Sequence, residues 1–92
     1  MRTAKEIAEQ RVERFLERCR ELGVKITHQR IEIYRELAST GEHPDALMLH
    51  KRIRKRMPTV SLDTVYRNLR LLESYGIISI VGMSHERLRF DA

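Results

Sequence analysis

The chain has 92 residues, enough for one small domain with a modest hydrophobic core. It carries 18 Lys and Arg against 13 Asp and Glu, a net charge of +5, and it contains one cysteine. A single cysteine excludes an internal disulfide and fits a reducing cytoplasm. No apolar run is long enough to cross a membrane, and the first residues lack the apolar core of a signal peptide. We therefore expect a cytoplasmic protein with no membrane partner.

Apolar periodicity predicts two helices in the first half of the chain. The first covers about residues 4–22 and ends at Gly23. Its apolar face comprises Ala8, Val12, Phe15, Cys19 and Leu22, so Cys19 is expected to be a buried small hydrophobe. Thr27 is expected to cap a second helix over about residues 27–39. The inner face of that helix comprises Ile31, Tyr34, Leu37 and Ala38.

A third helix is predicted over about residues 44–57, because Pro44 suits the first position of a helix and Pro58 ends one. The residues expected to be buried on it are Ala46, Leu49, His50, Ile53 and Met57.

A fourth helix is predicted over about residues 61–75. Ser61 is a good N-cap, Asp63 suits the positive end of the helix dipole, and Gly76 provides a left-handed stop. Its expected apolar face is Leu62, Val65, Leu69 and Leu72. Tyr66, Arg67 and Arg70 then lie on the opposite face. A cationic, aromatic-bearing helix of this length fits a DNA major groove.

Two short β-rich segments close the chain, over residues 77–81 and 87–91, with an expected turn at 82–86. The predicted fold is therefore mainly α with a small β hairpin, a winged helix-turn-helix in one domain over residues 1–92. The third and fourth helices form the helix-turn-helix pair, residues 61–75 are the recognition helix, and residues 77–91 are the wing.

Positive charge is concentrated before and within the recognition helix. Residues 51–70 carry a net charge of +6, and the rest of the chain sums to −1. Such a local excess indicates a polyanionic partner, although a basic run alone is often only a solvated helix face.

Three segments resemble the ferric uptake regulator (Fur) family of bacterial metal- and peroxide-responsive repressors. They are GVKITHQR at 23–30, HPDA at 43–46 and PTVSLDTVYRNL at 58–69, and the closing RFD fits as well. The resemblance covers roughly residues 10–91. It implies a DNA-binding domain that binds an inverted-repeat operator in double-stranded DNA. It also implies a following domain, absent from this chain, through which the protein would form a homodimer.

The resemblance assigns the DNA-reading residues. Tyr66 and Arg67 match the pair that meets base edges and thymine methyls in the major groove, and Lys25 matches a residue that enters the adjacent minor groove. The alternative for Tyr66 is partial packing against the third helix, and for Asn68 no base contact is expected. The residues expected to hold phosphates are Ser61, Thr64 and Arg70.

The resemblance also implies part of a sensory metal site. His43 and Asp91 match two ligands for Fe(II), Mn(II) or Zn(II), and the remaining ligands would come from the absent domain. We therefore expect no tightly bound metal in this chain. Outside the resemblance, a histidine before proline is more often a turn or cap residue. Asp91, as an aspartate, favours the peroxide-responsive (PerR-like) branch.

Other classes of function fit the sequence less well. Paired carboxylates, a Cys/His nucleophile arrangement and a glycine-rich phosphate loop are not evident, so no enzyme is predicted. A metal-buffering protein would need more ligands. The main alternative is a winged-helix protein-interaction module with a basic docking face, which would not require an aromatic residue beside Arg67.

Overall fold

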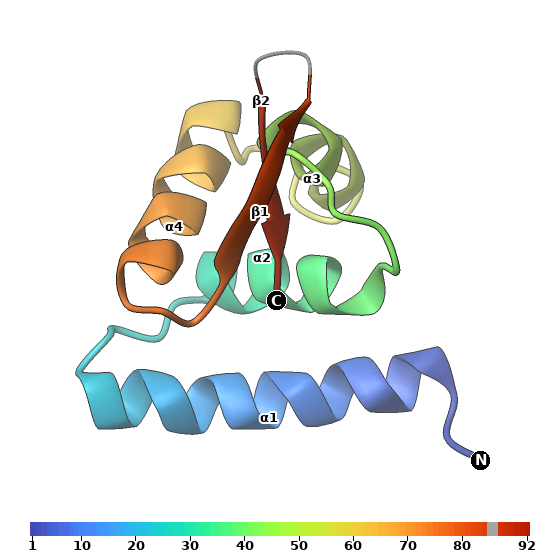
Figure 1. The fold of residues 1–92 in the computed structure, drawn as a ribbon, viewed down its shortest axis with the longest axis vertical. Coiled ribbons are helices and arrows are strands. Elements are labelled where there is room, and N and C mark those ends of the chain that lie inside the picture. The colour runs from blue at the N-terminus through green and yellow to red at the C-terminus, as the bar shows by residue number, and fades with distance from the viewer. Residues whose placement is uncertain (85–86) are drawn as a thin grey trace.

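The computed structural model describes residues 1–84 and 87–92 and confirms the predicted fold class (Figure 1). The described residues form four helices and an antiparallel hairpin, a winged helix-turn-helix. The elements are α1 (Ala4–Leu22), α2 (His28–Ser39), α3 (Ala46–Ile53), α4 (Leu62–Ser74), β1 (Ser79–Ser84) and β2 (Arg87–Asp91). Among these residues, no helix combines the length and the apolar character needed to cross a membrane.

The helices form two layers around one core. α1 lies along one edge of the molecule and packs on α2, whereas α3 and α4 stand on either side of the hairpin on the other face of α2 (Figure 1). The rings of Phe15 in α1 and Tyr34 in α2 are stacked, with centroids 4.3 Å apart. Such an aromatic pair adds about 0.5–1.5 kcal/mol to the burial of its surface.

The core has contributions from each helix and from the wing. Val65, Leu69 and Leu72 of α4 are fully buried, as are Leu49 and Ile53 of α3. Phe90 of β2, Phe15 of α1 and Ile33 of α2 belong to the same cluster. Because one face of α4 is committed to the core, the opposite face is held rigidly toward solvent.

The predicted bounds of the third helix were wrong at both ends. Asp45 is the N-cap, since its side chain accepts from the backbone N–H of Met48 at 2.9 Å, and α3 begins at Ala46. Pro44 lies before this cap and is fully buried instead of occupying the first helical position. The helix ends at Ile53, whose carbonyl accepts from the N–H groups of both Arg56 and Met57. A series of tight turns therefore replaces the predicted last turn of helix.

Some burial predictions also need correction. Leu22 and Leu62, at opposite ends of their helices, are 40% and 41% exposed. His50 and Met57 are only half-buried. On α2, Ile33 is fully buried although the periodicity did not indicate it. The ends of a helix extend past the core that its middle covers, and this explains the two exposed leucines.

Both predicted glycine stops adopt the left-handed conformation, with φ of 72° at Gly23 and 73° at Gly76. After α4, the N–H of Ile77 donates to the carbonyl of Leu72 at 3.0 Å and that of Gly76 to Glu73 at 2.9 Å. These bonds form a Schellman motif, which ends the helix and turns the chain into the wing.

The first strand runs further than predicted, from Ser79 to Ser84 instead of 77–81. Of the turn expected at 82–86, residues 82–84 belong to this strand, and residues 85–86 lie outside the described part. The hairpin pairs Ile80 with Phe90 and Ser84 with Arg87, and a bulge falls between Ile80 and Gly82.

The hairpin is fixed to the segment before α3. The N–H of Phe90 donates to the carbonyl of Pro44 at 3.0 Å, and Asp45 forms an isolated bridge with Arg89. The Arg89 side chain adds a bond to the carbonyl of His43 at 2.7 Å. These bonds place the end of the wing beside the start of α3.

Candidate nucleic-acid interface

The start of α4 is fixed by its cap. The Ser61 hydroxyl oxygen accepts from the backbone N–H of Thr64 at 3.0 Å and lies 2.8 Å from the Thr64 hydroxyl. Both residues were predicted to hold phosphates, and the structure brings them together at the positive end of the helix dipole. Backbone N–H groups at such an end, with adjacent hydroxyls, form a general anion site.

The exposed face of α4 carries the predicted reading pair. Tyr66 is 43% exposed, and the side chain of Arg67 is 78% exposed. Arg70 is also exposed. The guanidinium of Arg67 lies 2.5 Å from the carboxylate of Asp63, one turn earlier in the helix. This pair is surface-exposed, so it costs little to exchange for another partner.

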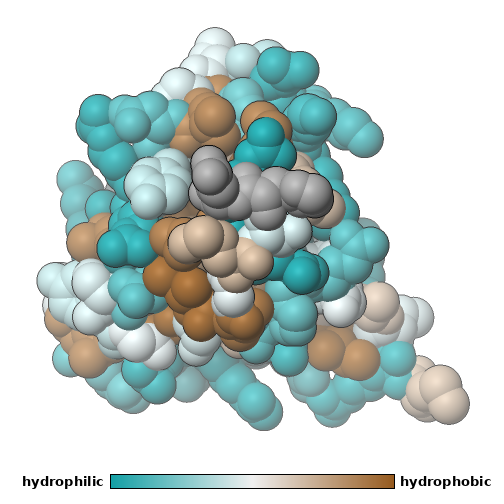
Figure 2. All heavy atoms as spheres, turned by 45° about the horizontal axis from the view of Figure 1, so that its top comes forward, coloured by the Kyte–Doolittle hydropathy of each residue, from teal (hydrophilic) through white to brown (hydrophobic). Residues whose placement is uncertain are grey.

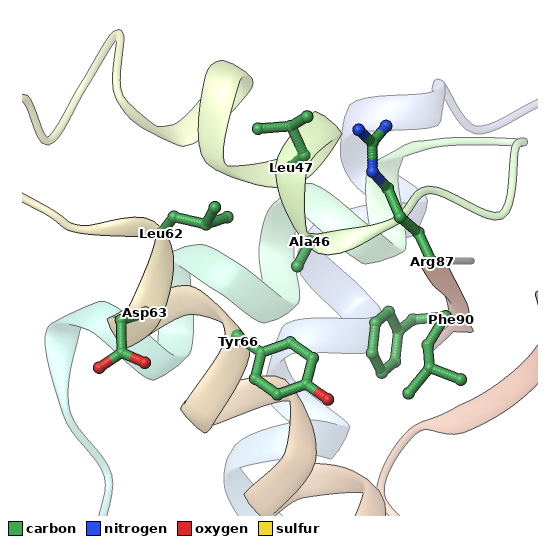
Figure 3. Close-up of a pocket in the computed structure, with 8 residues that line it drawn as sticks. Ala46, Leu47, Leu62, Asp63, Tyr66, Arg87 and Phe90 are labelled. Atoms are coloured by element: carbon green, nitrogen blue, oxygen red, sulfur yellow. The ribbon is translucent and has the colours of Figure 1, made fainter. Parts of the chain in front are cut away.

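Tyr66 forms one wall of an open groove between α3, α4 and β2. In Figure 3 its ring extends from α4 toward Phe90, while Asp63 points away from the groove. The groove has a volume of about 660 Å³. Its lining is mostly apolar: Ala46, Leu47, Leu62, Asp63, Tyr66, Arg87, Leu88 and Phe90.

The ring of Tyr66 lines this groove together with residues of α3 and stays substantially exposed. A DNA contact and partial packing against α3 therefore both stay predictions. When the top of the molecule is tilted toward the viewer, hydrophobic surface is visible in the middle of the face, surrounded by hydrophilic side chains (Figure 2). The exposed large hydrophobic residues on α4 and the wing are Leu62, Tyr66, Val81 and Met83.

Lys25 lies in the segment between α1 and α2, and this segment is connected to α4 through Arg30. The side chain of Arg30 donates from one terminal nitrogen to the carbonyl of Lys25 at 2.6 Å. Its Nε donates to Oδ1 of Asn68 at 2.9 Å, and the Asn68 amide nitrogen donates to the carbonyl of Thr64 at 2.9 Å. The Lys25 side chain itself is exposed.

The basic run at 51–56 is not a uniformly solvated cationic surface. Arg52 contacts Glu42 at 3.3 Å. Arg56 contacts Glu32 at 3.2 Å and Glu36 at 3.1 Å, and Glu32 is a buried carboxylate that also pairs with Arg35. Arg52 and Arg56, which the sequence analysis counted toward a surface for a polyanion, therefore pair with carboxylates of neighbouring segments instead.

The two predicted metal ligands also lie together. Nδ1 of His43 is 3.8 Å from Oδ1 of Asp91, and the two side chains are 47% and 52% exposed. Two donors that each lie about 2.0–2.2 Å from a metal ion can be at most about 4.4 Å apart, so this separation fits a shared ion. Among the described residues, no group of three or more His, Cys, Asp or Glu could hold a metal. Within the described part of the chain, the pair therefore provides two ligands and no third.

Sequence reasoning missed the contacts that three residues make in this region. Arg30 and Asn68 connect the Lys25 segment to α4, and Asp63 pairs with Arg67. The Asp63 pairing could have been found from its spacing of four residues on a helix. The contact between Arg30 and Asn68 joins residues far apart in the chain, and no local pattern indicates it.

The chain is similar to known proteins over most of its length. The ferric uptake regulator family matches residues 21–92. The peroxide-responsive repressor PerR of Staphylococcus aureus (strain USA300) is 34% identical over 86 residues, which cover 94% of this chain and 58% of that protein. Among solved structures, PerR from Streptococcus pyogenes is 32% identical with a TM-score of 0.78, over 87% of this chain and 55% of that one. A zinc-bound manganese uptake regulator is 36% identical with a TM-score of 0.75, over 83% and 58% respectively. The chain thus spans little more than half the length of these relatives.

Proposed function

Since this chain belongs to the ferric uptake regulator family, we propose that it is the DNA-binding domain of a metal-responsive transcriptional repressor that acts in the cytoplasm. The observation that carries the proposal is the division of α4 into two faces. Val65, Leu69 and Leu72 are fully buried on one side, and the Arg67 side chain is 78% exposed on the other. The core thereby fixes α4 so that the face carrying Arg67 and Arg70 is open to a polyanion.

On DNA, α4 would enter the major groove with Tyr66 and Arg67 at the bases. A guanidinium can donate to both acceptors of guanine, and a phenol ring can pack on a thymine methyl group. Arg67 would exchange Asp63 for the base. Lys25 would enter the neighbouring minor groove, where a narrow AT-rich segment has an enhanced negative potential.

Phosphate contacts would fix the helix in register without reading sequence. Ser61, Thr64 and Arg70 are exposed or half-buried along α4, and the first two lie at its N-terminus. The bond between their hydroxyls uses one of the two hydroxyl protons. The other hydroxyl proton would remain to donate to a phosphate oxygen, beside the unpaired backbone N–H groups of the first turn.

His43 and Asp91 would contribute an imidazole and a carboxylate to Fe(II), Mn(II) or Zn(II) in the longer protein. The second domain would supply the remaining ligands. The side chains of His43 and Asp91 lie 3.8 Å apart where the end of β2 meets the segment before α3. We further propose that the complete protein is a homodimer on an inverted-repeat operator, and that its signal is peroxide or a metal ion.

Selection from a randomised duplex library tests the proposal. The 92-residue chain should enrich a defined sequence, and its affinity for the enriched duplex should fall with salt at a log–log slope of about 0.9 per phosphate contact. Enrichment of no sequence, or binding that is insensitive to salt, would instead favour a protein-interaction module with a basic docking face.

A further inference from the structure

We infer that Arg30 is a positioning residue that fixes the distance between the Lys25 segment and the recognition helix α4, with Asn68 as its anchor. This inference rests on the proposed DNA-binding function. The two elements would read adjacent grooves of one duplex, so their separation would have to match the DNA. Arg30 is bonded to both elements.

The bonds of Arg30 form a continuous bridge. One terminal nitrogen donates to the carbonyl of Lys25 at 2.6 Å, and Nε donates to Oδ1 of Asn68 at 2.9 Å. The backbone N–H of Arg30 also donates to the Thr27 hydroxyl at 3.2 Å, which caps α2. Arg30 is thus attached at once to the start of α2, to the Lys25 segment and to the middle of α4.

Asn68 is held in place for this role. Its amide nitrogen donates to the carbonyl of Thr64 at 2.9 Å, so each of its two polar atoms already has a partner within the protein. Asn68 is half-buried, whereas its neighbour Arg67 is exposed. These bonds orient the amide so that its oxygen faces Arg30, and they explain why an asparagine beside the reading pair would not read a base.

The chemistry of the bridge requires an arginine. Its guanidinium is planar and directs several N–H groups at fixed angles, so one side chain can serve two acceptors in different directions. A lysine keeps the charge, but its single ammonium group on a flexible stem cannot reproduce both bonds. Arg30→Lys therefore separates positioning from charge.

The consequence for binding is a coupling between Lys25 and α4. With the bridge intact, Lys25 is held where the minor groove passes, and its removal costs affinity. With the bridge broken, the Lys25 segment has to become ordered when it binds DNA, and this loss of entropy offsets what the Lys25 contact contributes. Removing the Lys25 side chain should then lower the affinity much less. A double-mutant cycle measures this coupling directly.

The test uses the duplex enriched by the 92-residue chain and measures affinity by fluorescence anisotropy. Arg30→Lys and Asn68→Ala should each weaken binding on the order of tenfold, as the loss of a hydrogen bond to a charged group does. Lys25→Ala should weaken the unaltered chain, but add little to either variant. Arg18→Lys, on the exposed face of α1, is the matched control and should leave affinity unchanged.

A second measurement needs no DNA. In the free chain, the amide order parameters of residues 24–27 should fall in Arg30→Lys and Asn68→Ala. The order parameters of α4 should stay constant, and this would also show that both variants fold. Affinity of Arg30→Lys equal to that of the unaltered chain, or strictly additive losses with Lys25→Ala, would overturn the inference. If the unaltered chain enriched no duplex, the proposed function itself would fail, and the order parameters of residues 24–27 alone would then decide whether Arg30 bridges the two segments.

Discussion

Arg67, the more exposed member of the predicted reading pair, is bonded to Asp63 across one turn of α4 at 2.5 Å. The Asp63 carboxylate therefore already accepts from the Arg67 guanidinium that would contact a base. It also places a negative charge on the face that would approach DNA. We expect such a residue to lower the affinity for every duplex, and to do so most for a duplex that offers Arg67 no better partner.

Asp63→Asn should therefore raise affinity for DNA of random sequence more than affinity for the enriched duplex. Anisotropy titrations on both duplexes measure the two changes. Loss of a negative charge in the first turn should also lower the free energy of unfolding by about 0.3–1 kcal/mol. Glu17→Gln, on the exposed face of α1, is the control for net charge alone. An equal gain in Asp63→Asn and Glu17→Gln would show that Asp63 has no local role.

Glu32 is predicted to be a stabilising residue where α2 meets the segment after α3. Its side chain is 10% exposed and bonded to Arg35 in α2 and to Arg56 after α3. Glu32→Gln keeps the shape but loses both charged bonds, and we expect unfolding in urea to show a loss of about 1–3 kcal/mol. Both arginines are partly exposed, which limits the cost. A loss no larger than that of Glu17→Gln would contradict this role.

Cys19 should make stability fall at alkaline pH. Burial raises the pKa of its thiol, although the nearby Arg30 guanidinium opposes this, and burial likewise raises the pKa of Tyr34. A raised pKa in the folded state means that the unfolded chain loses these protons first. The contribution to stability is then complete below the unfolded pKa of the thiol, about 8.5, and is lost as pH rises above it.

Urea unfolding between pH 7 and 10 measures this decline. Cys19→Ala, although less stable overall because it removes a buried group, should show a shallower decline than the unaltered chain. The thiol should also react with an aromatic disulfide reagent only at the rate of unfolding. Immediate reaction in the native protein would contradict its burial.

The metal pair should bind weakly in this chain. Calorimetry with Mn(II) and Zn(II) is expected to show low affinity, because His43 and Asp91 provide two ligands where a stable site needs four to six. His43→Ala and Asp91→Ala should each abolish what binding there is. A tight one-to-one site, or one that survives both substitutions, would show that other residues hold the metal.

Local patterns predicted the fold well because its elements are periodic and capped. The buried faces of α1 and α4 follow from spacing, and the stops at Gly23 and Gly76 follow from the freedom of glycine at positive φ. The third helix was predicted too long because Pro44 suits the start of a helix in isolation. In the fold, Pro44 is buried and accepts a bond from Phe90, and Asp45 takes the cap.

The candidate site was predictable only where local spacing or the family resemblance identifies its residues. Tyr66 and Arg67 follow from the exposed side of an amphipathic helix, and the resemblance supplied Lys25, His43 and Asp91. The proximity of His43 and Asp91, and the bridge from Arg30 to Asn68, depend on long-range pairing that no local pattern encodes.

The most direct test of the DNA-reading role is the affinity cost of Arg67→Ala on two duplexes, the enriched one and a scrambled one of equal composition. We expect a cost of about 1–3 kcal/mol on the enriched duplex and a much smaller one on the scrambled duplex, since a bidentate base contact is lost only where the base is present. Equal losses on both duplexes would mean that Arg67 contacts phosphate alone and that α4 does not read sequence through it.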